Sequence, residues 1–318
     1  MTKETTKSLM NYLGLMLMIE TINLVKEYNN NKAVNNASVK IENGNIYGFI
    51  GKNGAGKTTF IRMIAGLIFP SSGEIIINGK KDYTSLAEQR KNMSFIVETP
   101  YYEPSLTAYE NMELQRLSRG ISSQNNPSQK WLEFVGLSDT GKKKACNFSL
   151  GMRQRLGIAM AMISEPNVLF LDEPVNGLDP VGIIKMRELI KNMNREFGTT
   201  IVISSHILSE LYQVATKYIF IDKGCIIGQF SKEQLDDNCK SYIEIEISDV
   251  QKSINILQSK LGCVDVRADN EKKLIRVYDE SADTSKIAYH LVNNGISLYK
   301  LNKSGLSLEE FFISKVGG

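Results

Sequence analysis

A glycine-rich loop constrains what this chain can fold into more than any other feature. Residues 51–58 read Gly-Lys-Asn-Gly-Ala-Gly-Lys-Thr, which fits the pattern G-x-x-x-x-G-K-[ST]. An apolar strand is predicted directly before the loop, at 46–50, and a helix directly after it, from Lys57 to Leu67. Glycines let the backbone curl so that its N–H groups face a phosphate, and the helix adds the positive end of its dipole. The loop therefore predicts a nucleotide-binding unit built as strand, loop and helix.

Two side chains at the end of this loop have chemical tasks of their own. Lys57 can reach the β and γ phosphates of a nucleotide, and Thr58 can ligate Mg²⁺. The nucleotide-binding residues predicted from the segment are Gly51, Asn53, Gly54, Ala55, Gly56, Lys57, Thr58 and Thr59.

A second chemical signal is the acidic pair Asp172 and Glu173, which follows an apolar strand predicted at 168–171. An aspartate at the end of such a strand can hold Mg²⁺. Glu173 beside it is free to activate water as a general base, a role that contributes about 10²–10⁴ in rate. An Asp-Glu dipeptide is common after a strand, so the pair takes its meaning from the glycine loop upstream.

The composition bounds the class of protein. The chain has 318 residues, which at roughly 150 residues per domain predicts two domains. Apolar residues make up 42% and charged residues 23%, which excludes a disordered or collagen-like chain. A net charge of +3 supplies no strong basic field for nucleic acid. With four widely separated cysteines and only two histidines, a zinc site is not expected.

The apolar runs of the chain are too short to cross a membrane. The longest extend over about eight residues, whereas a membrane-spanning helix needs about 20. Residues 13–19 read LGLMLMI after two lysines, a pattern that a signal peptide shares, but no small-residue cleavage site follows. We therefore expect residues 1–17 to be an N-terminal extension, with Met18 as an alternative start.

The predicted elements fall into two regions. Strands and helices alternate over the first two-thirds of the chain, which predicts an α/β fold with a parallel sheet. Within it, residues 19–79 are rich in strands and residues from about 100 to 160 read as helices and loops. A capping box from Thr107 to Glu110 predicts a helix start, and the lone Trp131 is expected in the core. From residue 239 to 318 a β-α-β-β-α order predicts a small α+β module.

Further motifs make a specific resemblance. The segment Phe148-Ser-Leu-Gly-Met-Arg-Gln-Arg-Leu156, placed 23 residues before Asp172, resembles the signature of the ATP-binding subunits of ABC transporters. Residues 176–179, Asn-Gly-Leu-Asp, resemble the D-loop of that family, and Ser-Ser-His at 204–206 resembles its switch histidine. Tyr28 resembles the aromatic residue that stacks on adenine. The match covers about residues 18–230, which implies an ABC cassette at 18–232 with a mixed sheet core, an antiparallel β subdomain and a helical subdomain.

The resemblance implies a mechanism and its residues. ATP and Mg²⁺ are the expected cofactors, and Lys57, Glu173 and His206 are the expected catalytic residues. Tyr28, Ser149, Gly151 and Asp179 join the loop residues as nucleotide ligands. Ser149 and Gly151 precede a helix that is predicted at 152–163. In the family, the signature segment faces the γ-phosphate bound to the other subunit, which implies a head-to-tail homodimer, or paired cassettes, with two ATP molecules at the interface.

Two positions depart from the family pattern. The signature has Leu150 and Met152 where the family often has glycine and glutamine, so Met152 is not carried over as a ligand. Glu98 stands where the family usually has glutamine. A carboxylate there can still meet Mg²⁺ or its waters, so we expect metal ligands at Thr58, Asp172 and Glu98. It cannot donate a hydrogen bond when ionised.

The Glu98-Thr-Pro pattern resembles subunits that protect bacteria from bacitracin or lantibiotics. It implies export of a peptide antibiotic through a separate transmembrane permease, with the chain held at the cytoplasmic face of the bacterial membrane. Export of another substrate, such as a drug or sodium, stays open. A non-transport ATPase of the same class that acts on nucleic acid or ribosomes is disfavoured by the single cassette and the weak charge. A GTPase is disfavoured because no N-K-x-D guanine reader appears.

The region from 239 to 318 carries no chemical motif. A segment that starts at Ser307 resembles a tail motif of the same subgroup and predicts a helix start. A role in dimer stabilisation, a regulatory role and inert packing are all compatible with the sequence.

Overall fold

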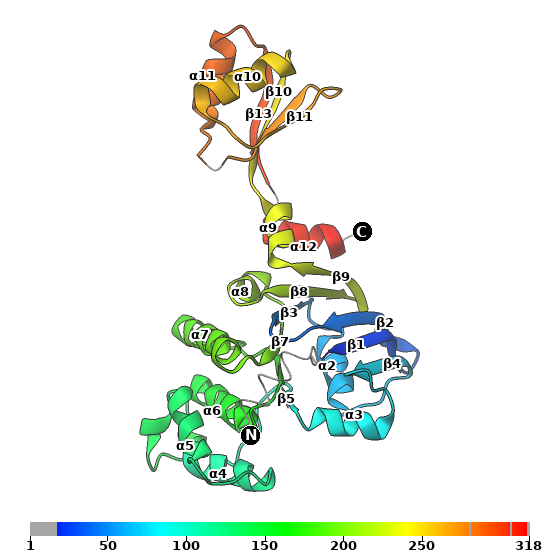
Figure 1. Cartoon of the computed structure of the whole chain (residues 1–318), viewed down its shortest axis with the longest axis vertical. Coiled ribbons are helices and arrows are strands. Elements are labelled where there is room, and N and C mark those ends of the chain that lie inside the picture. The colour runs from blue at the N-terminus through cyan, green and yellow to red at the C-terminus, as the bar shows by residue number, and fades with distance from the viewer. Residues whose placement is uncertain (1–17, 280, 306, 317–318) are drawn as a thin grey trace, which may run out of the picture. The chain divides into compact units, whose positions relative to one another are not determined.

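The computed structural model describes residues 18–279, 281–305 and 307–316 (Figure 1). The predicted N-terminal extension lies outside the described residues. The chain divides into two compact units, residues 1–232 and 233–318, and each is described by itself. No helix within the described ranges is long and apolar enough to cross a membrane.

The centre of the first unit is a six-stranded sheet with the order β5-β6-β7-β3-β8-β9. All neighbouring strands are parallel except β8 and β9. Every residue of β3, β6 and β7 is buried, because a parallel sheet is covered on both faces. The strands are β3 (Ile46–Ile50), β5 (Met93–Ile96), β6 (Val168–Asp172), β7 (Thr200–Ser205), β8 (Lys217–Asp222) and β9 (Cys225–Ser231).

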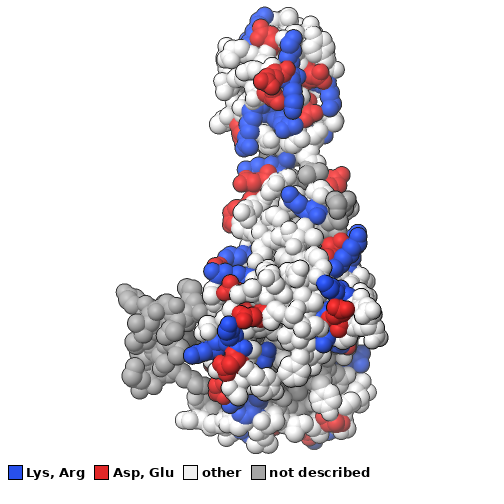
Figure 2. Space-filling view, turned by 90° about the vertical axis from the view of Figure 1, so that its right-hand side faces the viewer, with Lys and Arg blue, Asp and Glu red and all other residues white. Residues whose placement is uncertain are grey.

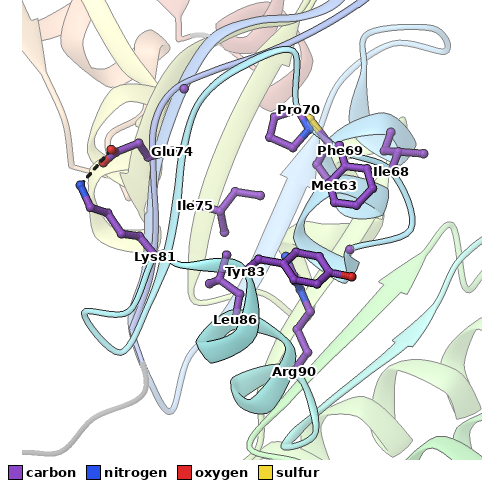
Figure 3. A pocket seen from close by; sticks show the side chains of 12 residues that line it. Met63, Ile68, Phe69, Pro70, Glu74, Ile75, Lys81, Tyr83, Leu86 and Arg90 are labelled. Carbon is purple, nitrogen blue, oxygen red and sulfur yellow. Dashed lines mark hydrogen bonds and ion pairs between the residues drawn. The ribbon is translucent and has the colours of Figure 1, made fainter.

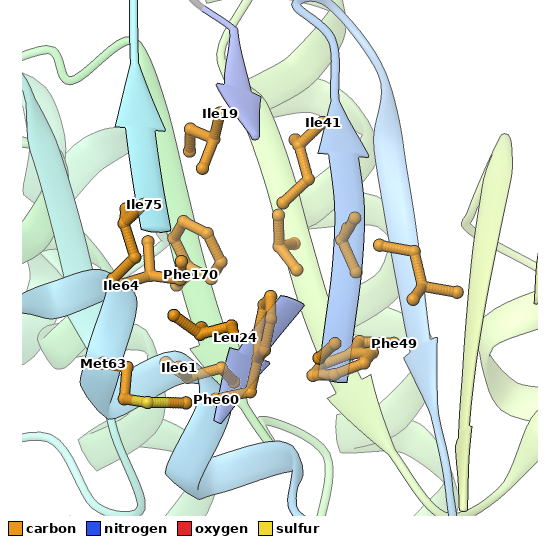
Figure 4. Close-up of a cluster of buried hydrophobic side chains, with 14 of the residues drawn as sticks. Ile19, Leu24, Ile41, Phe49, Phe60, Ile61, Met63, Ile64, Ile75 and Phe170 are labelled. Carbon is orange, nitrogen blue, oxygen red and sulfur yellow. The ribbon is translucent and has the colours of Figure 1, made fainter. Parts of the chain in front are cut away.

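A second, antiparallel sheet has the order β2-β1-β4 and supplies much of the core. Its strands are β1 (Ile19–Tyr28), β2 (Asn31–Ile41) and β4 (Ser72–Ile77), and the helix that follows the glycine loop is α2 (Lys57–Ala65). Apolar side chains from this sheet, from α2 and from the larger sheet form one buried cluster (Figure 4). In it Phe49 of β3 meets Phe60 of α2 edge-on, with ring centroids 5.2 Å apart. This packing fixes α2, and with it the glycine loop, against the sheet.

A helical region follows β5, as predicted for residues from about 100 to 160. Thr107 and Glu110 form the predicted capping box. Trp131 is buried against Phe134 and Phe197, as expected for core packing. The helices of the first unit after α2 are α3 (Tyr83–Arg90), α4 (Ala108–Ser118), α5 (Pro127–Phe134), α6 (Leu150–Met162), α7 (Pro180–Phe197) and the short α8 (Leu208–Tyr212).

The helix of the signature segment begins earlier than its hydrophobic pattern predicts. We expected Ser149 and Gly151 to precede a helix from Met152 onward, but α6 starts at Leu150. The reason is that Ser149 is the N-cap and its Oγ accepts a hydrogen bond from the backbone N–H of Met152, at 3.3 Å. Gly151 therefore lies within the first helical turn.

The second unit is a four-stranded antiparallel sheet with the order β11-β12-β10-β13. Its elements are α9 (Lys232–Cys239), β10 (Tyr242–Ile247), α10 (Val250–Leu261), β11 (Val266–Asp269), β12 (Leu274–Val277), α11 (Thr284–Asn293), β13 (Leu298–Ser304) and α12 (Leu308–Val316). The strand β13 completes a β-α-β-β-α-β order that the sequence pattern did not predict. Its polar residues outnumber the apolar ones, and pairing with β10 supplies its order. The predicted helix start at Ser307 is confirmed, with reciprocal hydrogen bonds to Glu310.

Candidate active site

The glycine loop has the curled backbone that its sequence predicts. Gly56 adopts a left-handed φ of 106°. A Cβ atom there would approach the carbonyl oxygen of Ala33 to 2.3 Å, so only glycine fits. α2 begins at Lys57 with no side-chain cap, which leaves the first N–H groups of the helix directed at the loop.

A cavity of about 230 Å³ lies against this loop. It is lined by every predicted loop residue from Asn53 to Thr59, together with Ala33, Glu173 and Asn176. The predicted Gly51 does not line the cavity, but its carbonyl oxygen accepts a hydrogen bond from Lys57 Nζ at 2.6 Å. Backbone N–H groups, a helix N-terminus and a lysine in one cavity form a site for phosphate.

Glu173 is held between two of the other predicted residues. Its Oε1 lies 3.3 Å from Lys57 Nζ, and its Oε2 lies 3.0 Å from His206 Nδ1. The φ of Glu173 is 50°, which turns its side chain toward the loop from the end of β6. His206 directly follows β7, the neighbour of β6, so the sheet brings the three side chains together.

Asp172 is buried and fully engaged in hydrogen bonds on both carboxylate oxygens. Thr58 Oγ1 donates to Oδ2 at 2.7 Å, and Ser204 Oγ donates to Oδ1. The same Ser204 Oγ accepts a hydrogen bond from the backbone N–H of Glu173, at 3.0 Å. Ser204 therefore orients both acidic residues, a role that the sequence did not single out. The parallel pairing of β6 and β7 places Ser204 beside Asp172.

The donors at this point fit a magnesium ion. Thr58 supplies a hydroxyl and Asp172 a carboxylate, both oxygen ligands. Among the described residues no group of three or more His, Cys, Asp or Glu could enclose a metal. Mg²⁺ needs no such cage, because it binds through one or two protein oxygens and takes its other ligands from phosphates and water.

A second cavity, of about 270 Å³, gathers three further predicted ligands. Ser149 and Gly151 line it from the start of α6, and Asp179 lines it from the start of α7. Asp179 Oδ1 accepts a hydrogen bond from Gly182 N at 2.8 Å and so caps its own helix. Two helix N-termini thus open onto one space, which favours an anionic ligand.

The structure therefore divides the predicted nucleotide ligands into two groups. The two cavities share no lining residue, and the chain passes from one to the other between Asn176 and Gly177. Arg155 lines the second cavity, and its Nη1 donates hydrogen bonds to the carbonyl oxygens of Val135 and Gly136. Burial lowers the pKa of the Arg155 guanidinium from its ordinary high value.

Five predicted residues line neither cavity. Gly51, Asp172 and His206 are bonded to residues of the loop cavity, whereas Tyr28 and Glu98 contact Lys26 and Arg62. Tyr28 is half-exposed at the end of β1, with Lys26 Nζ 5.0 Å from its ring centroid, and it lines neither cavity. Glu98, a predicted metal ligand, forms an ion pair of 2.5 Å with Arg62 of α2, whereas Thr58 and Asp172 are hydrogen-bonded to each other. The Glu98 backbone has a φ of 65°, which turns the chain sharply after β5.

Comparisons with known proteins agree with this geometry. A family model described as ABC transporter matches residues 34–176. The chain is 40% identical to the bacitracin transport ATP-binding protein BcrA of Bacillus licheniformis, over 95% of this chain and 98% of that protein. It is 43% identical to the lantibiotic transport ATP-binding protein SrtF of Streptococcus pyogenes, over 70% of this chain and 96% of that protein.

Solved structures agree as well. A dimeric bacterial ABC transporter cassette is 26% identical, with a TM-score of 0.61 over 67% of this chain and 98% of that chain. A dimeric post-hydrolysis state of an ATP-binding cassette, bound to ADP and phosphate, is 25% identical, with a TM-score of 0.60 over the same shares. With these relatives and the phosphate-binding loop in place, the chain belongs to the ABC transporter family, as an ATP-binding subunit that contains an ATPase cassette.

Proposed function

We propose that this ATPase powers export of a bacitracin-like peptide antibiotic through a separate membrane-spanning permease, at the cytoplasmic face of a bacterial membrane. The observation that carries the proposal is the extent of the match to the bacitracin relative, which spans nearly the whole of both chains. The alignment with the lantibiotic relative includes 96% of that protein but only 70% of this chain. Nearly a third of this chain therefore has no counterpart in it. The C-terminal unit therefore favours the bacitracin group.

The division of the ligands supports a dimer as the working form. Each chain has a cavity with the phosphate loop and a second cavity with Ser149, Gly151 and Asp179, and each cavity holds only part of the expected ligand set. A head-to-tail homodimer unites the loop cavity of one copy with the signature cavity of the other. Two ATP molecules then lie at the interface, and each contacts both copies.

Within one composite site the residues of this chain act as follows. When ATP binds, Lys57 leaves Glu173 and contacts the β and γ phosphates, because the phosphates carry more negative charge than one carboxylate. Glu173, still oriented by His206 and by its backbone bond to Ser204, accepts a proton from the attacking water. Thr58 and Asp172, which lie side by side, would hold the magnesium ion that accompanies ATP, and that ion would neutralise charge on the phosphates. Ser149 and Gly151 of the second copy bind the γ-phosphate.

A surface pocket of about 230 Å³ supports the permease partner (Figure 3). Apolar side chains from the end of α2, from β4 and from α3 line it, and the rings of Phe69 and Tyr83 lie 5.9 Å apart at its rim. Both rings are about two-thirds exposed, at 65% and 67%. An apolar helix of the permease fits such a surface. Arg62 and Glu98 connect the same helix α2 to the loop after β5.

The proposal is tested by purifying the tagged full chain from mildly solubilised membranes of its host. A polytopic protein should accompany it, and bacitracin resistance should fall when the gene is deleted. Plasmids with the wild-type gene should restore resistance, whereas Lys57→Ala should not, although the variant still reaches the membrane. Lack of any polytopic companion would remove the transport assignment, and resistance to an unrelated drug class instead would remove the substrate assignment.

A further inference from the structure

The second unit leaves one face of its sheet outside its own core. Ile243, Ile245 and Ile247 of β10 pack into a buried cluster with side chains from α10 and α11. Because successive side chains of a strand alternate, their neighbours lie on the other side of the sheet. We call that side the open face, and its residues include Tyr242, Glu244, Glu246, Asp265, Arg267, Asp269, Leu274, Arg276, Tyr278 and Lys300.

The aromatic side chains of the open face are ordered by their neighbours. Tyr242 and Tyr278 lie with ring centroids 5.3 Å apart. The guanidinium of Arg276 covers Tyr242 at 5.1 Å, and that of Arg267 covers Tyr278 at 4.4 Å. The open face is therefore pre-organised, which lowers the entropy cost of binding to it.

The open face carries charges of both signs. Glu244 pairs with Lys300 at 2.9 Å and with Arg276 at 3.4 Å, and these hydrogen bonds, that of Lys300 first, lower the pKa of its carboxyl. Three cations on the face stand beside four carboxylates, at 244, 246, 265 and 269. Figure 2 shows Lys and Arg beside Asp and Glu on this unit. Such a face lacks the excess positive charge that a nucleic acid or an anionic membrane requires.

The edges of the sheet are less suited to self-association than its face. β13, one edge, carries Lys300 and Lys303, and lysine on an edge strand opposes pairing with another strand. β11, the other edge, has only four residues. The open face is thus the larger surface on which a second copy can dock.

The charges follow the strands in a self-complementary order. β12 carries Arg276, and its neighbour β10 carries Glu244 and Glu246. If two open faces meet about a two-fold axis that runs along the strands between β10 and β12, each β12 lies opposite the other copy's β10. The arginine of each copy then meets the glutamates of the other, and the contact is repeated by symmetry.

We propose that the open face binds the same face of a second copy of this chain once ATP has joined the two cassettes. This inference rests on the dimer under Proposed function. Strand spacing near 4.8 Å and a rise near 3.3 Å per residue make the face roughly 19 by 16 Å, about 300 Å² per copy. A stable interface buries about 800 Å² per partner, so the faces do not hold two free chains together. They strengthen a dimer in which the joined cassettes already hold one open face near the other, at an effective concentration in about the millimolar range.

The test uses the full chain with Glu173→Gln, which keeps ATP bound, and measures the dimer dissociation constant by sedimentation. One variant has a basic face, Glu244→Lys with Glu246→Lys, and another has an acidic face, Arg267→Glu with Arg276→Glu. Each alone should weaken the ATP-dependent dimer at least about tenfold, because like charges then oppose each other. An equimolar mixture should restore the original affinity. Lys260→Glu with Lys286→Glu, which makes the charge change of the acidic variant on helices α10 and α11 at the other side of the sheet, should leave the affinity unaltered.

The outcomes separate this inference from the proposed function. If ATP dimerises the chain and neither face variant alters the affinity, the inference is overturned and the dimer stands. If the mixture fails to restore affinity, the charges do not meet across the interface, and the inference is again overturned. If ATP produces no dimer at all, the proposed composite site fails and the face contact with it. If the chain binds an oligonucleotide, and the acidic variant abolishes that binding without changing the dimer affinity, the inference is overturned and the face is assigned to nucleic acid.

Discussion

Replacement of Glu173 by glutamine separates ATP binding from ATP hydrolysis. The carboxylate lies 3.3 Å from Lys57 Nζ and 3.0 Å from His206 Nδ1. Glutamine keeps the size and can still bond to both neighbours, but it carries no charge and accepts no proton. Loss of a positioned general base lowers the rate by about 10²–10⁴. We therefore expect turnover to fall by at least about a hundredfold.

The same change should strengthen ATP binding. In the nucleotide-free protein Lys57 has to leave Glu173 before it can reach the phosphates. A hydrogen bond to a charged group contributes about 1.5–3 kcal/mol and one between neutral groups about 1 kcal/mol. The substitution removes roughly 1 kcal/mol of this competition, which corresponds to about fivefold tighter ATP binding.

The assay pairs phosphate release at saturating ATP with titration of a fluorescent ATP analogue, on wild type, Glu173→Gln and a matched control. Glu210→Gln is the control, because Glu210 also forms an ion pair, with Arg187, and its side chain is 21% exposed, as that of Glu173 is. The control should alter neither quantity by more than about twofold, since a single surface pair contributes about 0–1 kcal/mol. Wild-type turnover in Glu173→Gln would refute the base assignment, and unchanged affinity would refute the competition for Lys57.

Three further changes test other parts of the site. Ser204→Ala leaves one oxygen of the buried Asp172 carboxylate without its hydrogen-bond donor, so the free energy of unfolding should fall by about 1.5–3 kcal/mol. Calorimetry should show a lower unfolding temperature, and an unchanged temperature would contradict this. Tyr28→Ala should weaken ATP binding by about 1–3 kcal/mol if the ring stacks on adenine, whereas Tyr28→Phe should bind as wild type does; equal affinity in all three proteins would remove Tyr28 from the site. Glu98→Gln should leave the affinity for Mg²⁺ intact, because the carboxylate pairs with Arg62; a Mg²⁺ titration of ATPase activity that shifts by more than about tenfold would return Glu98 to the metal site.

Much of the cassette could be predicted because its signals are local. The order of strand, glycine loop and helix follows from short local patterns, so residues 46–65 could be predicted without a structure. The helix was predicted to continue to Leu67, but α2 ends at Ala65 because Gly66 adopts a left-handed C-cap. The capping box at Thr107 is local for the same reason. The start of α6 was misplaced by two residues, because the hydrophobic pattern outweighed the capping preference of Ser149.

Contacts between segments that are distant in the sequence could not be predicted from local patterns. The pairing of Glu98 with Arg62 depends on how the chain turns after β5, and the left-handed backbone of a glutamate has no sequence signal. β13 was missed because an edge strand with several polar residues lacks a clear hydrophobic alternation. Its order comes from β10, which lies more than fifty residues earlier.

The sequence by itself determined which side chains are suited to phosphate, which carboxylates are candidates for metal and water, and to which family the motifs point. Those properties belong to short segments whose residue types and spacing suffice. Only the tertiary structure decided how the chemistry is divided and supported. Ser204 joins Asp172 and Glu173 because β6 and β7 are parallel neighbours. The ligands separate into two cavities, and the second sheet keeps an open face, because packing brings distant segments together only where buried area offsets the lost chain entropy.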